Sequence, residues 1–62
     1  MRTELTIADP DAFYAALVAA HEGLSTEQSA ALNARLVILL ANQVGDGKVL
    51  LECIEAARHA SE

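Results

Sequence analysis

The dipeptide His21-Glu22 is the first place in the chain where two ionisable side chains adjoin in a way that suggests chemistry. An imidazole beside a carboxylate could form an acid–base pair or supply two ligands to a metal ion. Consecutive residues on a helix do not face each other, however. We therefore favour a structural role for His21, as a partly exposed side chain near a helix C-terminus, where the helix dipole favours positive charge.

Cys53 is the only cysteine of the 62 residues. A nucleophilic thiol needs a base and an activating charge, and neither is evident near Cys53 in the sequence. We expect this side chain to pack as a small hydrophobic group. Cys53, His21 and His59 are too far apart in sequence to match a metal-ligand spacing. The sequence therefore predicts no catalytic residue, no cofactor and no metal, and we expect that the protein is not an enzyme.

The first element that must position these side chains is a helix predicted over residues 10–22. Asp9 can cap it by accepting a hydrogen bond from a free amide, and Pro10 suits the first helical position. Gly23 can end it in the left-handed conformation. Apolar residues recur at steps of three and four, which is the helical period, and they form one stripe: Phe13, Ala16, Leu17 and Ala20.

Two more helices are predicted, over residues 26–44 and 47–59. Ser25 and Gln28 match a capping box at the start of the second helix, and Gly45 can end it. Asp46 can cap the third helix. With residues 1–8 as a lead-in arm and 60–62 as a frayed tail, residues 1–62 are expected to form a single all-α domain, a small three-helix unit with a central apolar helix.

The segment Leu36–Ala41 leaves the central helix without a polar face for almost two turns. A helix that is apolar all round has to be covered all round, and a domain this small has few elements for that task. Small folds are commonly stabilised by disulfides, metals or a partner chain, and only the partner chain remains here. We therefore predict a homodimer, with these candidate interface residues: Leu36, Val37, Leu39, Leu40 and Val44.

Asn33, Arg35 and Asn42 interrupt the apolar central helix. One interpretation is a polar recognition strip that hydrogen-bonds a partner and fixes its register, as polar residues at apolar seams can do. The other is a solvated edge of the helix. The sequence favours neither of the two.

The formal net charge of −5 bears on the partners of the chain. Its four Lys and Arg residues are dispersed, whereas nucleic-acid binding and binding to anionic membranes rely on clustered positive charge. We therefore expect no nucleic-acid and no membrane partner. No export signal is recognisable and the apolar run is too short to span a bilayer, so with one cysteine a cytoplasmic location is expected.

Four strings of the sequence resemble a known family of small bacterial proteins of unknown function, DUF2783. The resemblance extends from Ile7 to about Ala57, and Asn33, Arg35 and Asn42 belong to its most recognisable part. It implies a short, soluble, stand-alone protein, and it brings no assigned activity, cofactor or catalytic residue. The strings that carry it are Asp9–Tyr14, Ala20–Ser25, Ser29–Leu36 and Leu39–Asp46.

Three functional hypotheses follow. The first is a small acidic interaction protein that self-associates through its central helix. The second is an accessory subunit that docks on a larger enzyme, for which the family resemblance suggests a catabolic oxidoreductase. The third is a ligand-binding protein that uses His21, Arg35 and Asn42; because 62 residues leave little room for a pocket, its site is expected between subunits.

Overall fold

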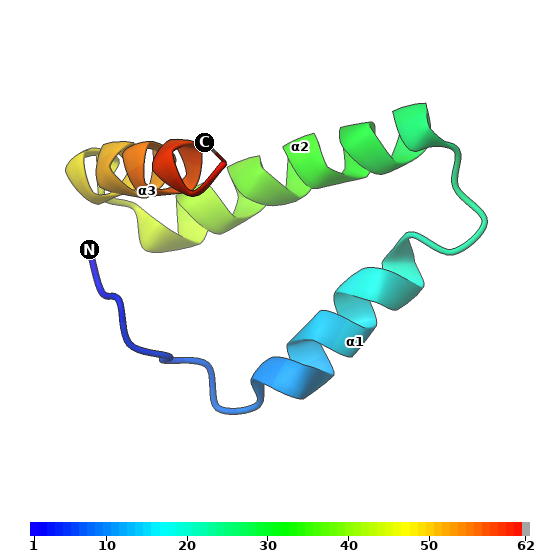
Figure 1. The fold of residues 1–62 in the computed structure, drawn as a ribbon, viewed down its shortest axis with the longest axis horizontal. Helices are drawn as coiled ribbons and strands as arrows, with labels where there is room; N and C mark the ends of the chain where they lie inside the picture. The colour runs from blue at the N-terminus through cyan, green and yellow to red at the C-terminus, as the bar shows by residue number, and fades with distance from the viewer. Residues whose placement is uncertain (62) are drawn as a thin grey trace.

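The computed structural model describes residues 1–61 as three α-helices preceded by an extended arm, with no β-strand among these residues. The helices are α1 (Pro10–Ala20), α2 (Thr26–Val44) and α3 (Gly47–Ala60). The predicted all-α, three-helix fold is therefore confirmed. α1 and α2 diverge from the turn that joins them like the two arms of a V, as Figure 1 shows.

Each helix begins where a side chain can accept a hydrogen bond from the free amides of the first turn. Asp9 accepts from the amide of Ala12 at 3.0 Å, and Asp46 accepts from the amide of Lys48 at 3.1 Å. At the start of α2 the Ser25 hydroxyl accepts from the amide of Gln28, whose side-chain oxygen accepts from the amide of Ser25. The predicted caps, including the capping box, are confirmed.

Two helix ends differ from the prediction. α1 ends at Ala20 rather than at residue 22, because the amide of His21 bonds the Val18 carbonyl at 3.1 Å and tightens the last turn. α3 runs one residue past the predicted end at residue 59. Ser61 holds that end, since its hydroxyl donates to the Ala57 carbonyl at 3.0 Å. The predicted frayed tail also includes Glu62, which lies outside the described residues.

The described residues contain no hydrophobic core. None of their side chains is buried, and the three helices share only marginal contacts. The half-buried residues come from all three helices and from the turn after α1: Leu17, His21, Ser29, Ala31, Leu32, Leu36, Ala41, Val49 and Leu50. Local signals such as the capping side chains, rather than a buried hydrophobic core, therefore determine where the helices of one chain form.

The arm returns the start of the chain to α3. The N-terminal ammonium of Met1 lies 2.9 Å from the Glu52 carboxylate, which is an exposed ion pair. The arm then passes along the open side of the V to the start of α1 (Figure 1). No helix within residues 1–61 combines the length and the apolar character needed to cross a membrane.

Candidate interaction surface

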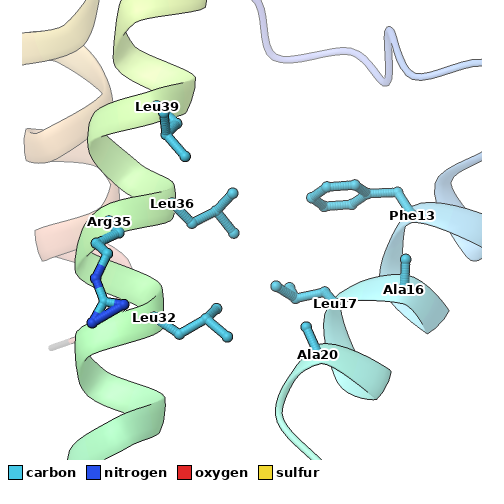
Figure 2. A pocket seen from close by; sticks show the side chains of 8 residues that line it. All are labelled: Phe13, Ala16, Leu17, Ala20, Leu32, Arg35, Leu36 and Leu39. Carbon is cyan, nitrogen blue, oxygen red and sulfur yellow. The ribbon is translucent and has the colours of Figure 1, made fainter.

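An open groove of about 370 Å³ lies between α1 and α2. Figure 2 shows the two sides of this groove: Phe13 and Leu17 point from α1 toward α2, and Leu32 and Leu36 point back toward α1. A space separates the two rows of side chains (Figure 2). Four residues line the groove from each helix: Phe13, Ala16, Leu17 and Ala20 from α1, and Leu32, Arg35, Leu36 and Leu39 from α2.

The groove is apolar except for one side chain. Seven of its lining residues are hydrocarbon side chains, and the eighth is Arg35. The apolar stripe predicted for the first helix thus faces the leucines of the second, but the two do not close over each other. The volume falls within the usual range of ligand pockets. The hollow is an open groove rather than an enclosed pocket, because α1 diverges from α2 instead of packing along it.

Arg35 lines the groove without a partner of its own. The guanidinium makes no hydrogen bond and no ion pair with any other residue of 1–61. Its neighbours in the groove are leucine, alanine and phenylalanine side chains, which cannot accept hydrogen bonds from its donors. A carboxylate from another molecule could pair with the positive charge of this guanidinium and accept hydrogen bonds from it.

Asn33 has a different environment from Arg35. Its side-chain oxygen lies 3.1 Å from Nε2 of His21, the residue that caps the end of α1. This hydrogen bond ties the apex of the V together. The side chain of Asn42 has no hydrogen-bond partner within the described part of the chain. The three residues of the predicted polar strip therefore have three separate surroundings, and the sequence offered no signal for the His21–Asn33 pair.

The predicted interface residues point to more than one side of α2. Leu36 and Leu39 line the groove, whereas Val37 and Leu40 do not. Val44 lines another hollow, of about 570 Å³, which is formed by the arm, the end of α2 and the first half of α3. Leu36 is half-buried, while Val37 is 65% exposed and Leu39 is 63% exposed. Most of the side chains assigned to the interface are thus available to another molecule.

α1 adds exposed apolar surface that the sequence analysis did not assign to an interface. Tyr14 is 66% exposed and Val18 is 49% exposed, and neither lines the groove. The available signal was the segment Ala12–Ala20, which contains no charged side chain. A helix of this composition is typical of a buried position.

The ionisable side chains of α3 form no cluster that resembles a catalytic or metal site. Glu55 pairs with Arg58 and with His59, each at 3.7 Å, on an exposed helix face. No three His, Cys, Asp or Glu side chains gather as metal ligands within residues 1–61. Cys53 is exposed, so the expectation of a packed thiol is wrong for the single chain. The reason is that α3 shares only marginal contacts with the other helices.

Comparison with known proteins identifies a family for this chain but no individual relative. No curated protein and no solved structure is significantly similar to this chain. Residues 1–59 match the model of a family described as a protein of unknown function, DUF2783, which covers nearly the whole chain. This protein therefore belongs to the DUF2783 family.

Proposed function

We propose that this protein is a small helical interaction protein that forms a homodimer through its central helix, α2. The observation that carries the proposal is the surface area of the single chain. The chain exposes 5342 Å², whereas a compact folded protein of its mass exposes ~3,800 Å². The excess of about 1,500 Å² per chain exceeds the ~800 Å² that each partner buries in a standard interface.

The chemical character of the excess surface supports association. Large apolar side chains on every helix are more than a third exposed. Apolar area removed from water contributes ~25 cal/mol per Å², so leaving this surface in water is costly. On α2 the exposed apolar side chains include four of the five predicted interface residues: Val37, Leu39, Leu40 and Val44.

A second copy is the simplest molecule that covers this surface. Most oligomers of small proteins are symmetric, and one apolar face then serves both partners. A larger protein would cover the same surface equally well, and that alternative predicts a different behaviour of the isolated chain. We also propose a cytoplasmic location, which the single free thiol of Cys53 supports. Cell fractionation tests the location.

The substitution Leu39→Asp tests the role of α2. Leu39 is exposed in the single chain, so a carboxylate is tolerated there in a monomer. In an interface, the same carboxylate would be buried without a hydrogen-bonding partner, and its desolvation would cost on the order of 3 kcal/mol or more. We expect the dimer to dissociate at concentrations at which the unsubstituted chain is dimeric, as measured by analytical ultracentrifugation.

Leu5→Asp is the matched control. It makes the same chemical change at a residue of the arm that is 80% exposed and lies outside all three helices. We expect this variant to remain a dimer. A dimer that survives Leu39→Asp as well as it survives Leu5→Asp would contradict an interface on this face of α2. A disordered or aggregated isolated chain that becomes helical only with another protein would support the accessory-subunit alternative instead.

A further inference from the structure

The groove between α1 and α2 has the size of a small-molecule site. Its volume of about 370 Å³ lies near the lower end of the range for ligand pockets. Leu17, Leu32 and Leu36 along its walls are already half-buried, so the space between them suits a slim molecule. At ~30 Å³ for each non-hydrogen atom, as in liquid water, the groove holds about twelve such atoms.

The walls of the groove determine how polar its occupant can be. Seven of the eight lining side chains are hydrocarbon, and only Arg35 carries hydrogen-bond donors. A peptide or a sugar has many polar groups, which would lose their hydrogen bonds to water along these walls without replacement. The groove therefore suits a molecule that has a long hydrocarbon part and a single polar group.

Arg35 determines the position and the charge of that polar group. It lines a second hollow as well, and the two hollows share Ala20 and Leu32, so Arg35 lies at the end of the groove nearest the turn after α1. In Figure 2 its guanidinium lies at the level of Leu32. Glu27 lines the second hollow but forms no ion pair with Arg35, so the guanidinium stays available. A guanidinium matches a carboxylate through two parallel hydrogen bonds.

We propose that this groove binds a medium-chain fatty acid, of about the size of decanoate. The carboxylate pairs with the Arg35 guanidinium at the end of the groove nearest the turn. The hydrocarbon chain extends from there between Leu17 and Leu36 toward Phe13 and Leu39, which line the groove at the open end of the V.

The inference does not depend on the proposed homodimer. Three of the predicted interface residues, Val37, Leu40 and Val44, do not line the groove, and all three are exposed. A dimer formed through these side chains leaves the groove open to a ligand. Binding of the fatty acid and association of the chain are therefore separate properties that separate measurements test.

The first test is isothermal titration calorimetry of the full chain with decanoate, octanoate and decanol below the concentrations at which they form micelles. We expect one decanoate per chain with a Kd below about 1 mM. Each methylene group removed from water strengthens binding by about fourfold, so octanoate is expected to bind at least about tenfold more weakly. Decanol has the same chain without the charge and is expected to bind about fivefold more weakly than decanoate.

The substitution Arg35→Gln tests the position of the carboxylate. We expect it to weaken binding of decanoate by about fivefold and to leave binding of decanol unchanged. A variant that had merely lost its fold would lose both ligands. Arg58→Gln is the matched control, because Arg58 is an exposed arginine on α3 that does not line the groove. It is expected to bind decanoate as the unsubstituted chain does.

The substitution Ala16→Leu tests the position of the hydrocarbon chain. Ala16 lines the groove, so a leucine there fills part of the space that the ligand needs, while leucine remains a good helix former. Ala19→Leu makes the same change on α1 at a residue that does not line the groove. We expect Ala16→Leu to weaken binding of decanoate by at least about tenfold and Ala19→Leu to change it by less than about twofold.

Each result either supports or overturns the inference. Absence of decanoate binding at about 1 mM would overturn it, as would equal binding of decanoate and decanol that Arg35→Gln leaves unchanged. Equal effects of Ala16→Leu and Ala19→Leu would also overturn it. Sedimentation of the same samples keeps the proposed function apart: a dimer that binds no decanoate retains the homodimer alone, and a monomer that binds decanoate retains the ligand site alone.

Discussion

At the residue scale, Asn33 shows how a side chain can belong to the structure of one chain rather than to recognition of another. The sequence places it with Arg35 and Asn42 in a polar strip on an apolar helix. The structure gives Asn33 a partner in the same chain, the His21 imidazole at 3.1 Å. No such partner exists within residues 1–61 for the side chains of Arg35 and Asn42. Of the three residues, Arg35 is therefore the best placed to contact a second molecule, because it lines the groove.

The His21–Asn33 hydrogen bond is expected to contribute modestly to stability. Asn33→Ala removes it, and because the bond is exposed to water we expect the free energy of unfolding to fall by ~0.5–1 kcal/mol. Asn42→Ala is the control, since it makes the same change in the same helix without removing a bond seen in the structure. Urea unfolding at one fixed chain concentration measures both. Equal effects of the two substitutions would contradict a stabilising role for the His21–Asn33 pair.

At the element scale, the sequence predicts the helices well because their signals are local. Asp9, Ser25 and Asp46 act within a few residues of their own position, so the start of each helix follows from the sequence. The end of α1 was missed by two residues because it depends on how His21 and Gly23 turn the chain toward α2. That turn also determines how widely the V opens.

Gly45 is the helix end with the clearest conformational requirement. It adopts a φ of +69°, and a Cβ there would meet only the Asn42 carbonyl oxygen at an ordinary 3.9 Å. The cost of Gly45→Ala is therefore conformational, and we expect a loss of ~1 kcal/mol in the free energy of unfolding. Gly47→Ala is the control, because Gly47 begins α3 in open space; there alanine is expected to be neutral or to stabilise by ~0.5 kcal/mol. Thermal unfolding followed by circular dichroism compares the two variants, and a larger loss for Gly47→Ala would contradict this account.

At the scale of the whole molecule, the sequence predicts which side chains are apolar but not how far a single chain leaves them exposed. The stripe with Phe13 and Leu17 and the leucines of α2 are both recognisable from their spacing. Their separation across a groove is not, because it depends on long-range packing that local signals do not encode. The interface residues predicted from the sequence also lie on α2 alone. The exposure of Tyr14 and Val18 on α1 adds a second helix to that surface.

The same exposure is the reason to expect that the chain associates. A chain without one buried side chain among residues 1–61 has little cooperative interior of its own, whereas two chains can enclose a shared interior. Folding and dimerisation are then expected to be coupled, so that helicity depends on protein concentration. This coupling distinguishes an obligate dimer from two stable monomers that merely touch.

The most direct test is the native mass and helicity of the unsubstituted chain, measured by sedimentation and circular dichroism from about 1 μM to about 100 μM. The account predicts a species of twice the 6.5 kDa chain mass at the upper concentrations, with helicity that falls as the dimer dissociates on dilution. A fully helical species of 6.5 kDa at every concentration would contradict it, because one chain would then be stable without covering its apolar surface.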